Sequence, residues 1–362
     1  SDLTGAGNLE KTDLGTLVLT GTNTIAGDLA VRTGTLRLAD GGTLGSAYTV
    51  VGREAGEQGI LTVTGSDGGG NASTWTTGDL MVGDNGTGTL NITAGGRVVS
   101  SIGNVGLNTS GVGQVVVSGA GSTWENSDRI NVGLFGTGSM RIENGGQVSS
   151  NDGIIGNSAH GEVLVTGAGS LWTNATQLNI GSFSTGALRI ENGASVVSNQ
   201  GYVGAGAGAI GNVVVTGAGS SWLVGPFNIA IGNNGNGTLT IENGGRVRAE
   251  GGLYLGGVTG ASGALVLQGT AANRAVLETS GLQAGAGTVS VSIDGGLLRA
   301  TDDNGNFFNN FGANDLALGA NGVAIDTDGH AIGIVPRFVG GGGLIKDGAG
   351  TLLLSPANTY GG

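Results

Sequence analysis

The sequence predicts an all-β protein and, within that class, a parallel β-helix, or solenoid. Three observations predict this fold: a sequence repeat of nearly constant length, abundant glycine, and short apolar runs that are rich in branched residues. Repeats of roughly 20 to 50 residues are typical of chains that stack one supersecondary unit on the next. We therefore expect the function to lie on an extended surface instead of in one deep cleft.

The tryptophans mark the repeat. The chain has four of them, at spacings of 49, 48 and 50 residues, and a similar phrase surrounds each. Around the second and third, this phrase begins GQVVVSGAGSTW and GEVLVTGAGSLW. The regular spacing favours one continuous stack over several globular domains in a chain of 362 residues. The four residues are Trp75, Trp124, Trp172 and Trp222.

Glycine excludes long helices. The chain has 80 glycines, and no glycine-free stretch is longer than eleven residues. Each glycine inside a helix costs about 1 kcal/mol relative to alanine. Runs such as Val115–Val117 and Leu239–Ile241 are branched or alternate in polarity, which is typical of strands. The glycines between such runs supply the backbone angles that tight corners need.

Each repeat is expected to hold four or five short strands and to span two coils of roughly 20 to 25 residues, which gives about 15 coils in the chain. In the Trp172 copy the expected strands are 162–166, 170–173, 177–180, 187–190 and 195–198. Alternation along these strands predicts which apolar side chains point into the core. They include Met140, Ile142, Leu188, Ile190, Leu239 and Ile241.

Charge and composition exclude several classes of function. The net charge is −12, from 14 basic and 26 acidic residues, so no basic stripe is present for the phosphates of a nucleic acid. The lack of cysteine excludes disulfides, a Cys-ligated zinc and a thiol nucleophile. The first residues, Ser1–Gly5, do not resemble a signal peptide, and residues 355–362 resemble a motif cut short, so we expect a fragment.

The four tryptophans are candidates for a ligand platform, on which sugar rings would stack. The alternative is that each tryptophan packs on the coils next to it. We favour packing, because recurrence within a structural repeat needs only a structural cause. Rings two coils apart on one face would also lie about 10 Å apart, too far for direct stacking.

A second set of candidates is acidic. Paired carboxylates with a nearby histidine serve as acid and base in glycoside cleavage. A structural turn is nevertheless the favoured interpretation of these residues, and the spacing lacks the pattern of a calcium loop. We therefore expect no catalytic residue, metal or cofactor, and His160 is placed in an exposed loop without a serine elbow near it. The acidic candidates are Asp302, Asp303, Asp326 and Asp328, with His330.

Asparagine recurs before glycine at one place in successive repeats, as Asn144, Asn192 and Asn243, with Ala94 in that place in the first copy. Asparagine before glycine usually forms a turn, because it tolerates left-handed backbone angles. The sequence therefore predicts corners at these positions instead of a ligand site.

Two end motifs carry a family resemblance. Residues 7–24 include GNLEKTDLGTLVLTGTNT, and residues 342–360 include GGLIKDGAGTLLLSPANTY, so that Leu9, Lys11, Gly15, Thr16, Asn23 and Thr24 recur 335 residues later. The motif resembles the passenger-associated transport repeat of type V secretion autotransporters, with Pro356 in place of the usual glycine. The resemblance implies a right-handed parallel β-helix in a Gram-negative bacterium, carried across the outer membrane by a C-terminal β-barrel translocator.

On this basis we divide the solenoid into residues 1–45, with the first motif, residues 46–270, with the four tryptophan repeats, and residues 271–362, with irregular coils and the second motif. We expect a non-enzymatic rod, displayed on the bacterial surface or secreted, that acts as an adhesin or in self-association. Its partners would be a host matrix or cell-surface protein or glycan, or another copy of itself. The alternatives are a polysaccharide hydrolase or lyase that uses the acidic candidates, and a passive stalk.

Overall fold

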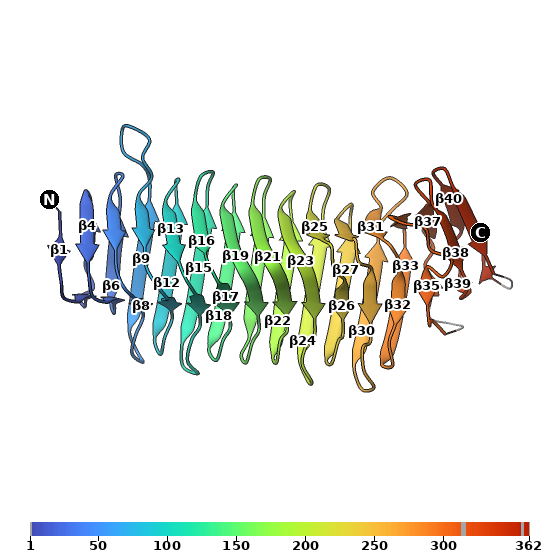
Figure 1. Cartoon of the computed structure of the whole chain (residues 1–362), viewed down its shortest axis with the longest axis horizontal. Helices are drawn as coiled ribbons and strands as arrows, with labels where there is room; N and C mark the ends of the chain where they lie inside the picture. The colour runs from blue at the N-terminus through green and yellow to red at the C-terminus, as the bar shows by residue number, and fades with distance from the viewer. Residues whose placement is uncertain (1, 313–315, 356–357, 362) are drawn as a thin grey trace. The chain divides into compact units, whose positions relative to one another are not determined.

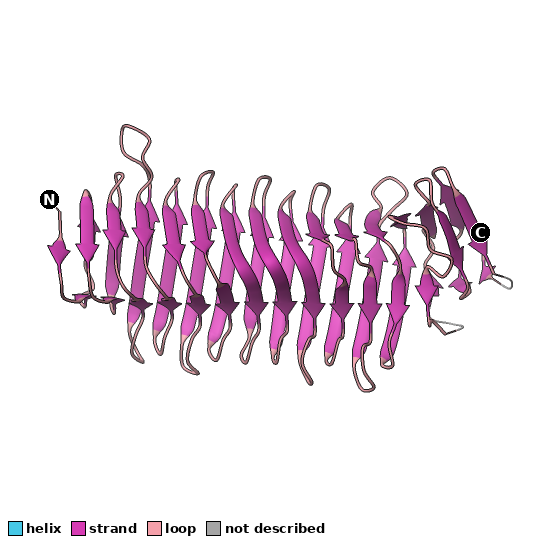
Figure 2. Ribbon diagram, viewed as in Figure 1, coloured by secondary structure: helices cyan, strands magenta, loops and turns pink. Residues whose placement is uncertain are grey.

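A computed structural model describes residues 2–312, 316–355 and 358–361 of the chain. The described residues form strands and no helix, so none of them belongs to a helix that could span a membrane (Figure 2). The strands are parallel and stack as a β-solenoid of about 13 turns, which agrees approximately with the expected number of coils and confirms the predicted fold class. Pro356, where the second motif departs from its usual form, lies outside the described residues.

The chain divides into two compact units, one comprising Ser1–Ala175 with Ser184–Ala187 and the other Thr176–Phe183 with Leu188–Gly362. Within each unit a turn contributes three strands, which pair with the corresponding strands of the turns before and after (Figure 1). We call the three resulting ladders the first, second and third faces. Because the strands inside each ladder are paired on both sides, their backbone hydrogen bonds are satisfied within the stack.

In the first unit, the first face consists of β3 (Thr16–Leu19), β6 (Gly34–Leu38), β9 (Gln58–Thr64), β12 (Thr87–Thr93), β15 (Val112–Ser118), β18 (Thr137–Glu143) and β20 (Gly161–Thr166). The second face consists of β1 (Thr4–Gly5), β4 (Thr22–Ile25), β7 (Thr43–Gly45), β10 (Thr74–Thr76), β13 (Arg97–Ser100) and β16 (Thr123–Asn126). The third face consists of β2 (Leu9–Lys11), β5 (Leu29–Val31), β8 (Thr49–Val51), β11 (Leu80–Val82), β14 (Gly103–Val105) and β17 (Arg129–Val132), and β19 (Gln147–Ile155) continues both the second and third faces. The strands β21 (Leu171–Ile180) and β22 (Thr185–Glu191) have residues in both units.

In the second unit, the first face consists of β24 (Ile210–Thr216), β27 (Asn236–Glu242), β30 (Ser262–Gln268), β33 (Thr288–Asp294), β36 (Leu316–Leu318), β39 (Phe338–Gly340) and β42 (Thr359–Tyr360). The strand β23 (Ser195–Val203) begins both other faces. The second face continues with β25 (Ser221–Val224), β28 (Arg246–Ala249), β31 (Ala275–Thr279), β34 (Gly296–Ala300), β37 (Val323–Asp326) and β40 (Leu344–Asp347). The third face continues with β26 (Ile229–Ile231), β29 (Leu253–Leu255), β32 (Leu282–Ala284) and β35 (Phe308–Asn309), and β38 (Ala331–Ile334) pairs with β41 (Thr351–Leu354).

The core is an apolar ladder, as the alternation of side chains predicts. On the first face Leu90, Val115 and Met140 occupy one register position in successive turns, and all three are at most 2% exposed. The other side chains expected to point inward are also buried: Ile142, Leu188, Ile190, Leu239 and Ile241. Apolar side chains stack on apolar side chains from one turn to the next, so neighbouring turns stabilise each other.

One strand prediction was wrong in its details. The two strands expected at 170–173 and 177–180 are a single strand, β21, whereas the equivalent residues of the preceding copy form the separate strands β16 and β17. The preceding copy has Ser127 and Asp128 at the break, and these residues favour a turn. At the same place β21 has Ala175 and Thr176, and β-branched threonine favours the continuing strand.

The recurrent asparagines form corners, as their position before glycine predicts. Asn144, Asn192 and Asn243 have left-handed φ angles of 55°, 58° and 53°, and Ala94 has 51° in the equivalent corner. Asn144 also donates from Nδ2 to the Ser118 hydroxyl at 3.1 Å, which ties its corner to the preceding turn. These asparagines therefore shape the backbone.

Candidate functional site

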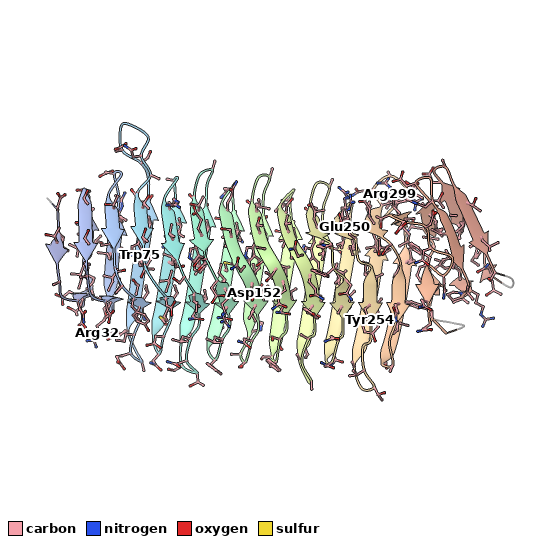
Figure 3. The ribbon with its side chains drawn as sticks, in the orientation of Figure 1. Arg32, Trp75, Asp152, Glu250, Tyr254 and Arg299 are labelled. Atoms are coloured by element: carbon pink, nitrogen blue, oxygen red, sulfur yellow. The ribbon has the colours of Figure 1, made fainter. Side chains whose placement is uncertain are left out.

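The tryptophan rings lie inside the solenoid, so the structure places them away from any surface ligand. All four side chains are 0% exposed, and Figure 3 shows Trp75 within the ribbon. Trp124 donates from its ring nitrogen to the Ser100 hydroxyl at 3.1 Å. A shallow hollow of about 250 Å³ lies next to Trp124, but the ring contributes no exposed surface to it.

The end-motif residues are also structural. Lys11 is buried, and its ammonium group donates to the carbonyl of Asp13 and, at 3.1 Å, to that of Thr33. Asn23 accepts the Leu3 N–H at 3.0 Å, and its Nδ2, which has two hydrogens to donate, lies within 3.3 Å of three carbonyl oxygens. In the second motif, the ammonium group of the equivalent lysine donates to the carbonyls of residues 347 and 348, and the equivalent asparagine accepts a backbone N–H at 2.9 Å. Both copies therefore use lysine and asparagine to bind backbone groups at corners. The equivalent residues are Lys346 and Asn358.

Two of the candidates for acid–base chemistry, Asp328 and His330, line one cleft of the second unit, and Asp326 and Asp303 pair with residues that line it. This cleft has a volume of about 280 Å³ and lies over the second-face strands β28, β31 and β34. Its lining includes three arginines, and we call it the arginine cleft; Figure 3 labels one of these residues, Arg299. The charged and titratable residues that line it are Arg246, Arg248, Glu278, Arg299, Asp328 and His330.

A ladder of alternating charge builds the cleft. Arg248, Glu278, Arg299 and Asp326 occupy one outward register position in four successive turns. Glu278 is only 4% exposed, and its carboxylate lies 2.5 Å from Arg246 Nη2 and 2.9 Å from Arg299 Nη1. A buried carboxylate needs such partners, because an unpaired charge in the interior is strongly destabilising. Glu278 therefore fixes the two guanidinium groups.

The pKa of each of two acidic candidates is lowered. Burial raises the pKa of Asp326, but the hydrogen bond from Arg299 Nε at 2.8 Å and that from the Asp328 N–H outweigh it. For Asp303 the backbone N–H of Ala331 lowers the pKa most, at 2.8 Å, and His330 Nδ1 at 3.3 Å lowers it further. A general acid for glycoside cleavage needs a raised pKa. Both carboxylates are therefore better suited to accepting hydrogen bonds than to donating a proton.

The sequence analysis missed the arginines of this cleft. Arg246 and Arg248 each have a buried Nε without a hydrogen-bond partner among the described residues, so the protein leaves donors of both guanidiniums unpaired. In the sequence, such a ladder would be recognised as a charged residue at the same position of each successive coil. Of the four predicted acids, Asp328 alone belongs to the cleft lining; Asp302 lies at an exposed turn, where its carboxylate accepts the Asp303 N–H.

Two further clefts lie in the second unit. The apolar cleft, of about 410 Å³, is lined by Val197, Leu223 and Pro226 and shares Arg248 with the arginine cleft. The amide cleft, of about 250 Å³, lies over the third-face strands β29 and β32 and includes Tyr254. In the described part of the chain, no three histidine, cysteine, aspartate or glutamate residues are grouped so that they could hold a metal ion.

Comparisons with known proteins agree with the end motifs. The model of the passenger-associated transport repeat family matches residues 9–38 and 344–362. The crystal structure of a TibC-catalysed, hyper-glycosylated TibA fragment, residues 55–350, aligns over 100% of both chains with 15% identity and a TM-score of 0.41. No curated protein matches the chain in sequence. The resemblance predicted from the two end motifs is confirmed: the chain carries passenger-associated transport repeats at both ends.

Proposed function

We propose that the chain is a non-enzymatic passenger that acts as an adhesin or in self-association through the outward side chains of its solenoid. The observation that carries the proposal is the pair of adjoining clefts in the second unit, which share Arg248 and follow side chains of successive turns. A surface built from repeated turns can contact a partner at several points, and several weak contacts together bind strongly through avidity. The lowered pKa values of Asp303 and Asp326 support binding over acid catalysis.

Exposed aromatic rings on the corners support the same proposal. Phe135, Phe183 and Phe227 are 52%, 68% and 57% exposed. Large aromatic side chains are enriched at protein interfaces, because they bury much apolar area on contact. Such rings on a bacterial surface would contact a host protein or a second copy of the chain. The transport repeats support surface display or secretion from a Gram-negative bacterium, with a C-terminal translocator as the partner in export.

The test uses beads coated with the purified chain. We expect them to bind host-matrix proteins or glycans, or to aggregate with one another. Arg248→Ala should weaken this adhesion, because Arg248 lines both clefts, whereas Arg189→Ala should leave it unchanged. Arg189 is a matched control, an exposed arginine paired with Glu191 on the first-face strand β22.

Three results would contradict the proposal. Beads that bind no matrix protein, no glycan and no other bead would remove the basis for an adhesin. Adhesion that survives deletion of residues 59–260 would favour a passive stalk. Cleavage of a polysaccharide that is lost in Asp326→Asn or Asp328→Asn would favour the hydrolase or lyase.

A further inference from the structure

We propose that the amide cleft binds a neutral saccharide. This inference deepens the proposed function and rests on it, since it names one class of ligand that the passenger would hold. The cleft has six side chains that can contact a ligand through polar atoms or an aromatic ring, and apart from one serine the rest of its lining is glycine and leucine. The six residues are Asn228, Tyr254, Gln283, Asn304, Asn306 and Asn309.

Three of these side chains form a ladder across the third face. Tyr254, Gln283 and Asn309 occupy one outward register position in the successive strands β29, β32 and β35. Turns of a solenoid lie about 4.8 Å apart. The three side chains therefore present hydrogen-bonding groups in one row, one for each turn.

The amides hold one another in position and keep part of their bonding capacity. Asn304 Nδ2 donates to the Ser280 carbonyl at 2.7 Å, and Asn306 Nδ2 donates to Asn309 Oδ1 at 2.8 Å. An amide has two donors and one acceptor oxygen, so, among the residues that the structure describes, Asn309 keeps both N–H donors and Asn306 keeps its oxygen for a ligand. The cleft therefore offers donors and acceptors side by side, which is what a hydroxyl group needs.

Glycine gives the cleft its depth. A Cβ atom at Gly281 would lie 2.5 Å from Asn304 Nδ2, and one at Gly251 would lie 2.6 Å from the backbone carbon of Phe227. Larger residues would displace the neighbouring groups and fill the floor. Tyr254 is half-buried, and its hydroxyl group donates to the Gly257 carbonyl at 3.2 Å, which fixes the ring. A tyrosine ring held in this way offers an apolar face to the C–H side of a sugar.

The cleft disfavours other classes of ligand. Its lining contains no charged residue, so it has no ion-pair partner for an acidic ligand, a cation or a nucleic-acid phosphate. Strands β29 and β32 are paired on both sides, so an extended peptide finds no free edge to which it could add as a strand. The volume of about 250 Å³ lies below the ~300 Å³ at which drug-sized sites begin. The class of ligand that remains is a neutral one, with the size of about one or two sugar residues.

The experiment is a screen of the purified chain against immobilised neutral, sialylated and sulfated glycans, followed by calorimetry with the best neutral binder. Gln283→Ala and Tyr254→Ala should each raise Kd about tenfold, which corresponds to a loss of about 1.4 kcal/mol. Gln283 is exposed, so its truncation should leave the fold intact. The matched control is Tyr202→Ala, because Tyr202 shares the register position of Tyr254 two turns earlier and lies outside the cleft lining. The Kd of the Tyr202→Ala variant for the neutral glycan should equal that of the native chain.

Binding of acidic glycans alone, or unchanged affinity in both cleft variants, would overturn the inference. Equal weakening by Tyr202→Ala would overturn it as well. If no neutral glycan binds but the coated beads still adhere to matrix proteins or to one another, the saccharide site fails and the adhesin proposal stands. If neither assay detects binding, both fail.

Discussion

Trp124 and Gly103 form a packing pair that a single methyl group should disrupt. Trp124 lies on β16, fully buried, and Gly103 lies on β14 in the turn before it. A Cβ atom at Gly103 would lie 2.5 Å from Cζ2 and 2.9 Å from Cη2 of the indole ring. Gly103 lacks a positive φ, so the backbone itself accepts alanine. The change Gly103→Ala therefore tests mainly the ring contact, with a lesser contact to Asn126 Oδ1 at 3.1 Å.

The expected magnitude follows from two opposing effects. Extra atoms in a packed core cost about 1–3 kcal/mol. Replacing glycine with alanine in a compatible conformation stabilises the protein by about 0.4–1 kcal/mol, because it lowers the conformational entropy of the unfolded chain. The net loss for Gly103→Ala is then about 0–2.6 kcal/mol. Gly45→Ala is the control: Gly45 lies in strand β7, and a Cβ there meets no atom within 4 Å, so it should be neutral or stabilising.

The assay is denaturant unfolding followed by tryptophan fluorescence, with hydrogen exchange to locate the loss, because a stack of repeats can unfold in parts. A double-mutant cycle with Trp124→Phe isolates the contact. The smaller ring should make Gly103→Ala milder than it is in the native background, by about 0.5–2 kcal/mol. The steric argument is refuted if Gly103→Ala is as stable as Gly45→Ala, or if the cycle shows no coupling.

Three further predictions concern corners and charges. Asn144→Ala should lower the unfolding free energy by about 1 kcal/mol because of its left-handed φ, and Asn144→Gly by less; a larger loss for glycine in denaturant titrations would contradict the turn argument. The Arg97–Glu125 pair is bidentate, at 2.8 and 2.6 Å, but each side chain is 41% exposed, so a double-mutant cycle should give a coupling under about 1 kcal/mol that falls with added salt. The pKa of Asp326 is lower in the folded state than in the unfolded state, where it is about 3.9. The stabilisation from this carboxylate is therefore present above the unfolded-state pKa and is lost as the pH falls through the folded-state pKa. Urea midpoints at neutral and acid pH should therefore show a smaller loss on acidification in Asp326→Asn than in the native chain, and an equal loss would argue against this assignment.

The fold could be predicted because its causes are local. Glycine corners and alternating apolar residues act within a few positions of one another, so a passage such as Leu239–Ile241 already indicates a strand and its buried face. The arginine cleft could not be predicted in this way. The spacings along its ladder are 30 residues from Arg248 to Glu278, 21 to Arg299 and 27 to Asp326. Unequal loops hide the register, and only the folded chain aligns these residues.

The amide cleft was hidden for a different reason. Asn304, Asn306 and Asn309 stand among glycines and aspartates, where asparagine ordinarily indicates a turn. Both roles are physically compatible, because an asparagine can bond to the backbone with one end of its amide and leave the other end exposed. Asn304 forms the turn with both ends of its amide, since its Oδ1 accepts the Asn306 N–H and its Nδ2 donates to the Ser280 carbonyl, whereas Asn306 donates from Nδ2 to Asn309 and, within the described part of the chain, keeps its Oδ1. Sequence spacing alone does not separate such residues from ordinary corners.

Packing explains why the tryptophans recur every two turns. Val98, Trp124 and Val148 occupy one register position in successive turns of the first unit. On the third face, the same three turns present Gly103, Ile130 and Gly153. The turn with the large ring thus carries isoleucine, and the turns with valine carry glycine. The ring of Trp124 extends into the space beside Gly103. An isoleucine in place of Gly103 would fill the space that this ring occupies. The period near 48 residues is therefore the shortest one in which large and small side chains can alternate, and it needs no ligand to explain it.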